Sequence, residues 1–252
     1  MKTSQAQEQT GFVFIHGAGL DSTIWKRVAI QLEAPCLLID FPHRQEKSAS
    51  RKQLSLEDYT EHLSAQINGW EVKRFFLVAH SIGGVPALRI ASKHKAQLAG
   101  FVAVGAVIPA EGESFMSVFP PARRILMGMM MRVFGTRPPE AVIRQGLCSD
   151  LPPEQCDDIV RRFTPESLRL YSEPVAARIP SELPSMYVKL QQDKEVSPTL
   201  QDRMIRNLRA DHTALLDSGH LPMLSRPDEL RTVLHEFMNS NLGGNNRPAP
   251  KP

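Results

Sequence analysis

The order of apolar segments constrains the fold of this chain more than any other feature. Short runs of β-branched and apolar residues alternate with helical patterns along most of the 252 residues. This alternation is typical of a parallel sheet with helices on both faces, because buried strands read as continuous apolar runs and each parallel connection needs a crossover. We expect six strands, at residues 12–15, 36–40, 75–79, 100–107, 186–190 and 212–216.

Two helices are predicted with clear starting points. Four apolar residues recur at helical spacing between positions 56 and 67, and Ser55 with Asp58 forms a variant of the capping box in front of them. A second helical pattern follows Pro227, a residue that suits a first helical turn. The first helix connects two strands, and the second closes the fold.

The alternation breaks between about residues 109 and 184. This stretch contains short helical patterns and many prolines but no convincing strand. We interpret it as a helical cap inserted into one α/β domain, so that residues 11–108 and 185–240 form the core. Residues 241–252, which include GGNNRPAPKP, are predicted to be a disordered tail.

Composition and charge narrow the possible partners. Hydrophobic residues make up 42% and charged residues 23% of the chain, which is the balance of a globular protein with a sizeable core. The net charge is +3, two of the basic residues lie in the expected tail, and no run of five basic residues occurs. We therefore expect no nucleic-acid partner.

The sequence carries no recognisable export or membrane segment. The first ten residues are polar, and the longest apolar run, around 101–108, is too short to span a bilayer. We expect a cytoplasmic protein without a membrane partner. The three cysteines lack metal-binding spacing, so we expect no metal site. Cys148 and Cys156 could form a disulfide only in an oxidising compartment.

Residues 75–91 read FFLVAHSIGGVPALRIA, in which an apolar strand pattern meets a helical pattern at Ser81. This is the context of a nucleophile elbow, a sharp strand-to-helix turn that exposes a strained serine. The residues two before and two after the serine must be small because the chain reverses tightly, and here they are Ala79 and Gly83. We predict that Ser81 is a nucleophile; the alternative is a serine in an ordinary strand–helix turn.

A serine nucleophile needs a base to accept its proton and an acid to orient that base. His220 follows the strand expected at 212–216, and Asp193 follows the strand expected at 186–190. Both therefore lie at carboxyl ends of strands, where open parallel sheets bind ligands. Serine, aspartate, histidine is also the chain order expected for this elbow, so we assign His220 as the base and Asp193 as the acid.

Other histidines and acids fit these roles less well. The competing histidines fall in helical patterns, in a loop or at the start of a strand: His62, His94, His235, His43 and His212. His16 and His80 flank the motifs, where we expect supporting hydrogen bonds. Among the competing acids, Glu195 lies only two residues past Asp193, and Asp217 is more typical of a turn. Glu111 and Glu113 follow the fourth strand and are expected at the hinge of the cap.

Attack on a carbonyl also needs N–H donors for the oxyanion, and losing one donor costs on the order of 3 kcal/mol of barrier. The N–H of Ile82 starts the helix after the nucleophile. The loop after the first strand, FIHGAGLDSTIW at 14–25, supplies the second donor, which we assign to Ala18. The alternative is a plain connection; a phosphate loop is not supported, because neither phosphate-binding pattern is present.

The expected cap contains an apolar helical face built from Leu126, Met127, Met130, Met131 and Phe134. Methionine fills irregular apolar surfaces, so this face either packs on the main domain or forms an apolar wall beside a substrate. In the second interpretation, the residues around the substrate are Gly17, Trp25, Met127, Met130, Met131 and Leu221.

With HGAG, AHSIGG, a lone aspartate after the fifth strand and SGHLPML, residues 11–240 resemble the α/β-hydrolase superfamily. HGAGLDSTIW and GHLPMLSRPDEL also resemble its compact branch of plant methylesterases, hydroxynitrile lyases and small bacterial esterases. The resemblance implies an α/β-hydrolase fold in which Ser81 is acylated, His220 acts as base and then acid, and no cofactor is needed. Hydroxynitrile lyases of that branch carry threonine at the position of Gly17 and lysine at that of Leu221, which argues against lyase activity.

These features together predict a serine carboxylic ester hydrolase that acts on a small to medium apolar ester. Hydrolysis of a carbon–carbon, lactone or amide bond by the same three residues is an alternative. A ligand-binding receptor that keeps a hydrolase shell is another, since fold alone does not define function. The expected partner is a small-molecule ester, and the sequence leaves the oligomeric state open.

Overall fold

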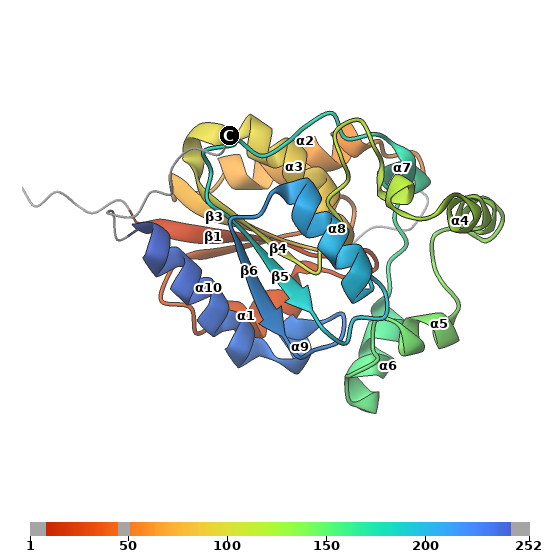
Figure 1. Cartoon of the computed structure of the whole chain (residues 1–252). Coiled ribbons are helices and arrows are strands. Elements are labelled where there is room, and N and C mark those ends of the chain that lie inside the picture. Colours follow the sequence, from red (N-terminus) through yellow and green to blue (C-terminus); the bar gives the residue numbers. More distant parts are fainter. Residues whose placement is uncertain (1–8, 45–50, 243–252) are drawn as a thin grey trace, which may run out of the picture.

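Six parallel strands form one sheet in the computed structural model, which describes residues 9–44 and 51–242 (Figure 1). The strands are β1 (Thr10–Ile15), β2 (Cys36–Ile39), β3 (Arg74–His80), β4 (Leu98–Val104), β5 (Ser185–Leu190) and β6 (His212–Leu216). Their order in the sheet is β2-β1-β3-β4-β5-β6, and every neighbouring pair is parallel. The predicted α/β fold with a six-stranded sheet is confirmed.

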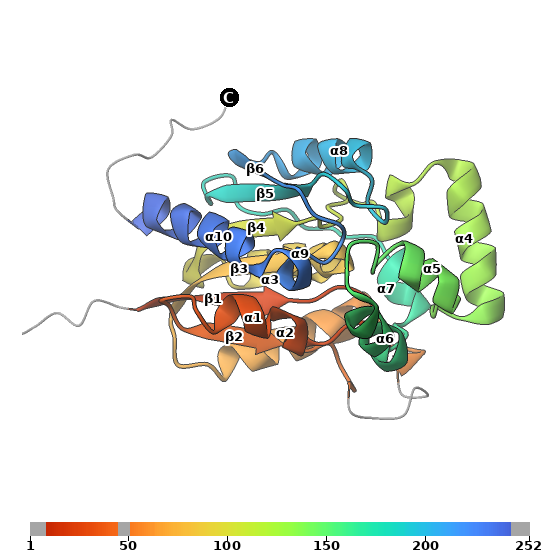
Figure 2. The same cartoon turned by 90° about the horizontal axis from the view of Figure 1, so that it is seen from below.

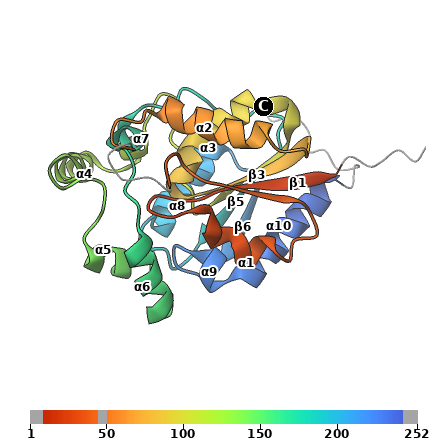
Figure 3. The ribbon, with the colours of Figure 1, turned by 180° about the vertical axis from the view of Figure 1, so that it is seen from behind.

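Helices cover both faces of this sheet, as Figures 1 and 3 show. One face carries α2 (Leu56–Asn68), α3 (Gly84–Lys93) and α8 (Pro198–Leu208), and the other carries α1 (Lys26–Ala29), α9 (Pro222–Ser225) and α10 (Pro227–Leu242). Strand residues alternate between the two cores: Val13 and Ile15 belong to the first, and Phe12 and Phe14 to the second. Both faces are therefore buried, which explains the continuous apolar runs in the sequence.

The start of α2 confirms the predicted capping box. The Ser55 hydroxyl accepts the Asp58 N–H at 3.1 Å, and the Asp58 carboxylate accepts the Ser55 N–H at 2.7 Å. Each side chain thus pairs with a backbone group that has no partner within the helix.

Strand β4 ends earlier than its apolar run suggests. We expected it to reach residue 107, but it stops at Val104 because Gly105 adopts a positive φ of 50°. A Cβ atom at Gly105 would lie 2.6 Å from the Leu190 side chain and 3.4 Å from an oxygen of Asp193. The chain leaves the sheet here because a glycine permits both this conformation and this close approach.

Residues 109–184, all of them described, contain four α-helices and no strand. The helices are α4 (Pro121–Phe134), α5 (Glu140–Gln145), α6 (Pro153–Arg162) and α7 (Leu168–Ser172). An isolated β-bridge between Gly19 and Thr164 joins this inserted segment to the loop after β1. Figure 2 shows its helices beside the ends of the strands, with α4 outermost. The division into core and cap domains stays a prediction.

The C-terminal helix runs past the boundary expected for the tail. Helix α10 continues to Leu242, two residues beyond position 240, and residues 243–252 lie outside the described part of the chain. Within the described residues, no helix is both long and apolar enough to cross a membrane.

Candidate active site

Ser81 lies at a sharp turn between strand β3 and the short 3₁₀ helix η3 (Ser81–Gly83), which continues into α3. Its φ of 53° is in the left-handed region, an uncommon and strained conformation for a residue with a side chain. A Cβ atom at Gly83 would lie 2.6 Å from the carbonyl oxygen of His16, so only glycine fits there. Two residues before Ser81, Ala79 is fully buried and its single methyl group is accommodated. The turn has the features of a nucleophile elbow.

His220 and Asp193 converge on Ser81 from the two strands at the β6 edge of the sheet. His220 Nε2 lies 3.0 Å from Ser81 Oγ, and its Nδ1 lies 2.8 Å from Asp193 Oδ2. The other carboxylate oxygen of Asp193 accepts the backbone N–H groups of Glu195 at 2.8 Å and Val196 at 3.0 Å. Three side chains from separate parts of the chain thus form one continuous line of hydrogen bonds.

The charges in this line reinforce one another. Burial alone would raise the pKa of Asp193, but the nearby charge of His220 and three hydrogen bonds hold it below its usual value. Burial alone would lower the pKa of His220, but the Asp193 carboxylate raises it above the usual 6.5. Asp193 is therefore an anion at neutral pH and stabilises the protonated imidazole.

Two further histidines make the supporting hydrogen bonds expected from the sequence. His16 lies with Nδ1 2.8 Å from the Gly17 carbonyl, and its Nε2 accepts the Phe41 N–H at 3.2 Å. His80 Nε2 donates to the carbonyl oxygen of His220 at 2.8 Å. Burial lowers the pKa of both rings, to about 3 for His80, so both are neutral. Since neutral His80 donates from Nε2, its Nδ1 carries no proton.

The loop after β1 passes directly over the serine. A Cβ atom at Gly17 would lie 2.9 Å from both Ser81 Cβ and His80 Nδ1, so a larger residue cannot be placed here without movement. Ala18 follows Gly17 on this loop, and Ile82 follows Ser81 at the start of η3. The two residues predicted to donate N–H groups to the oxyanion are therefore the immediate sequence neighbours of Gly17 and Ser81.

The residues predicted around the substrate lie in several different places. Trp25 and Leu221 are fully buried in the core on the α1 and α10 face, where the Trp25 ring packs 5.0 Å from that of Phe14. Met130 is 46% exposed, whereas Met127 and Met131 are partly buried against the other core. The apolar pattern of α4 located a helix but did not identify which side faces inward, because both sides are apolar.

Sequence analysis also missed an acid beside the histidine. Asp150, in the loop between α5 and α6, accepts the N–H of Gly219 at 2.6 Å, directly before His220. These residues are 69 positions apart, and no local pattern signals the contact.

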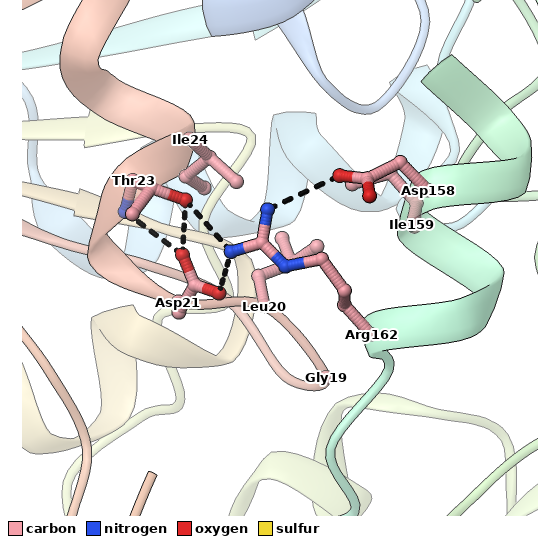
Figure 4. A pocket seen from close by; sticks show the side chains of 8 residues that line it. All are labelled: Gly19, Leu20, Asp21, Thr23, Ile24, Asp158, Ile159 and Arg162. Atoms are coloured by element: carbon pink, nitrogen blue, oxygen red, sulfur yellow. Dashed lines mark hydrogen bonds and ion pairs between the residues drawn. The ribbon is translucent and has the colours of Figure 1, made fainter. Parts of the chain in front are cut away.

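A small cavity of about 20 Å³ marks a joint between the inserted segment and the loop after β1 (Figure 4). Arg162 of α6 fills its polar side, with ion pairs to Asp21 at 2.5 Å and Asp158 at 3.1 Å. Its lining residues are Gly19, Leu20, Asp21, Thr23, Ile24, Asp158, Ile159 and Arg162. The cavity has room for about one water molecule and lies where the inserted segment contacts the loop after β1.

Among the described residues, no group of three or more histidine, cysteine or acidic side chains is placed to hold a metal ion.

The parallel sheet and the strand–serine–helix turn define the α/β-hydrolase class. The chain belongs to the alpha/beta hydrolase family, because the sequence model of that family matches residues 12–233.

Two relatives align with nearly the whole length of the chain. Methylesterase 18 of Arabidopsis thaliana is 27% identical over 266 aligned residues, which cover 91% of this chain and 97% of that protein. Methyl jasmonate esterase 1 of Vitis vinifera is 24% identical, with the same coverage of both chains. An extracellular alpha/beta-hydrolase from a Paenibacillus species has the same fold, with a TM-score of 0.77 at 17% identity over 92% of this chain and 98% of that one.

Proposed function

We propose that this protein is a serine carboxylic ester hydrolase that forms an acyl-enzyme on Ser81. The observation that carries the proposal is the line of hydrogen bonds from Ser81 through His220 to Asp193, with distances of 3.0 and 2.8 Å. A hydroxyl, an imidazole and a carboxylate in this order activate a serine for attack on a carbonyl.

In the first half of the reaction, His220 Nε2 accepts the proton of Ser81 as Oγ bonds to the ester carbonyl carbon. Asp193 stays ionised and accepts the hydrogen bond from Nδ1 of the imidazolium. The N–H groups of Ile82 and Ala18 stabilise the oxyanion, each worth about 3 kcal/mol of barrier. The proton on His220 then passes to the departing alcohol oxygen, which leaves an ester on Ser81.

In the second half, His220 removes a proton from water, and the resulting hydroxide attacks the acyl carbon. Collapse of the second tetrahedral intermediate releases the carboxylic acid and returns the proton to Ser81 Oγ. The neutral His80 ring donates to the carbonyl of His220 at 2.8 Å and so holds the backbone that carries the base.

We infer that the substrate is a small to medium apolar ester with a small alcohol group. The names of two relatives, a methylesterase and a methyl jasmonate esterase, support a methyl ester. A threonine at position 17, the residue expected in a hydroxynitrile lyase, would place its Cβ 2.9 Å from Ser81 Cβ. This close contact argues against lyase activity of that kind.

Hydrolysis of p-nitrophenyl and methyl esters of short and medium acids tests the proposal. The parent protein should hydrolyse them, and Ser81→Ala should lose activity by about six powers of ten, down to a residue supported by the oxyanion donors. Equal rates for the two proteins would reject the proposal.

A further inference from the structure

Helix α4 turns an apolar side outward. Six of the ten large exposed apolar side chains in the described residues lie on it: Ile125, Leu126, Met129, Met130, Val133 and Phe134. Figures 1 and 3 show this helix end-on at the periphery, and Figure 2 shows it along its length at the outer edge of the molecule. So many exposed apolar groups on one element mark an interaction surface.

The outward residues form one row. Ile125, Met129 and Val133 follow one another at a spacing of four residues and lie on one side of the helix. Met127 and Met131 make the opposite row, which packs against the core. The outward row is therefore not needed to attach α4 to the protein.

The charged residues of α4 itself are all arginines. Between Glu113 and Glu140 the chain carries four arginines, with no acid and no lysine: Arg123, Arg124, Arg132 and Arg137. At about 100° per residue, the six exposed apolar residues cover about half of the helix circumference. Arg132 lies at one border of this half, and Arg123, which stacks on the Phe119 ring at 4.6 Å, lies near the other. An apolar row bordered by cations is the pattern of a helix that lies in a lipid interface.

We propose that α4 docks onto an anionic lipid surface, with Ile125, Met129 and Val133 among the acyl chains and Arg123 and Arg132 at the level of the phosphates. The helix has 14 residues and is about 21 Å long, so it lies along the surface rather than crossing it. This inference goes beyond ester hydrolysis and replaces the expectation that the protein has no membrane partner. A second copy fits less well, because pairing two α4 helices would place arginines against arginines.

Co-sedimentation with lipid vesicles tests this proposal on the full chain. The parent should bind vesicles of phosphatidylcholine with phosphatidylserine, and added salt should weaken the binding. Arg123→Gln with Arg132→Gln should weaken it by on the order of tenfold or more. Ile125→Ser with Val133→Ser should abolish it, whereas Ile30→Ser, which changes an 82% exposed residue outside α4, should not.

Two controls separate the outcomes. Ser81→Ala should bind vesicles as the parent does, so vesicle binding can fail or succeed independently of ester hydrolysis. Circular dichroism should show that each variant keeps the parent's melting temperature. The proposal is overturned if the parent stays in the supernatant, or if the α4 variants bind as the parent does. A parent dimer that the α4 variants convert to monomers would overturn it in favour of a second copy.

A separate observation concerns Asp150 and the backbone before His220. A Cβ atom at Gly219 would lie 2.4 Å from Asp150 Oδ1 and 3.0 Å from Ser149 Oγ, so the carboxylate occupies the space of a side chain there. Asp150 Oδ1 is buried and has no hydrogen-bond partner among the described residues, while Oδ2 accepts the Gly219 N–H. Glycine at 219 is thus explained by contact with the inserted segment.

The backbone of residues 219 and 220 is held from two sides. Asp150 accepts the N–H of Gly219 at 2.6 Å, and His80 donates to the carbonyl of His220 at 2.8 Å. Resting on the proposed function, we infer that Asp150 is a positioning residue for His220 and ties the imidazole's loop to the inserted segment.

Variants at both ends of this contact test the inference. Asp150→Ala should lower kcat by about 100-fold with less effect on KM, because a displaced base costs that much. Gly219→Ala should be impaired by the clash, and combining it with Asp150→Ala should recover activity relative to Gly219→Ala alone, since the removed carboxylate leaves room for the methyl group.

A titration of the histidine rings by NMR provides a readout independent of activity. Asp150→Asn should lower the pKa of His220, because the carboxylate contributes to raising it. Asp217→Asn, at an exposed acid three positions before His220, is the matched control and should shift it less. An unchanged His220 titration in Asp150→Asn, or parent kcat in Asp150→Ala, would overturn the inference. Loss of ester hydrolysis in the parent itself would instead reject the proposed function.

Discussion

A buried ion pair between Arg44 and Glu166 fastens the inserted segment to the loop after β2. Their side chains are only 7% and 0% exposed, and the second Glu166 oxygen accepts the Tyr59 hydroxyl at 2.9 Å. Burial raises the pKa of Glu166, against the lowering effects of Arg44 and Tyr59. The carboxylate therefore depends on its partners to remain ionised in the interior.

Arg44→Met should destabilise the protein by about 3–5 kcal/mol, because it leaves a buried carboxylate without its cation. For a chain of this size that corresponds to a fall in melting temperature of about 6–20 °C. Thermal and urea unfolding followed by circular dichroism measure it. Adding Glu166→Gln should recover part of the loss, since no charge then stays unpaired.

Arg89→Met is the matched control, because Arg89 pairs with Glu57 on the surface, where the side chains are 30% and 39% exposed. That substitution should cost about 1 kcal/mol or less. If Arg44→Met lost no more stability than Arg89→Met, the reasoning on burial would be refuted.

Three further predictions concern the site and the cysteines. kcat/KM should fall as the pH drops through a midpoint above 6.5, because His220 must be unprotonated to accept the Ser81 proton and its pKa is raised; a midpoint below 6.5 in a pH–rate profile would contradict this. Gly17→Ala should lower kcat by about 100-fold through its contact with Ser81, without unfolding the protein, and parent kinetics would show that the loop yields freely. Cys148 and Cys156 are buried free thiols, and burial raises the pKa of Cys148 to about 12. Both should therefore react with a disulfide reagent only after unfolding. Rapid labelling of the native protein would contradict this prediction.

The fold could be predicted because its signals are local. Strands β1, β3, β4 and β5 are runs of mostly buried residues. The capping box at Ser55 and the turn at Ser81 need only a few consecutive residues. The positions of His220 and Asp193 followed from strand ends, since parallel strands bring their carboxyl ends to one edge. The line of hydrogen bonds at that edge agrees with this expectation.

Contacts between distant segments could not be predicted in the same way. The early end of β4 depends on the approach of Leu190 to Gly105, and the Asp150–Gly219 hydrogen bond joins two loops without any shared pattern. Trp25 was expected beside the substrate, but its ring packs in the core beside Phe14. Tertiary packing decided each of these cases, and packing has no signature in a short window of sequence.

Covalent labelling with a fluorophosphonate, followed by mass spectrometry, tests the central claim most directly. We predict one adduct on Ser81, no adduct in Ser81→Ala, and labelling slowed by several powers of ten in His220→Ala, whose base cannot accept the proton. Folded parent protein that stays unlabelled, or that is labelled equally fast without His220, would contradict the account and favour a ligand-binding protein with a hydrolase fold.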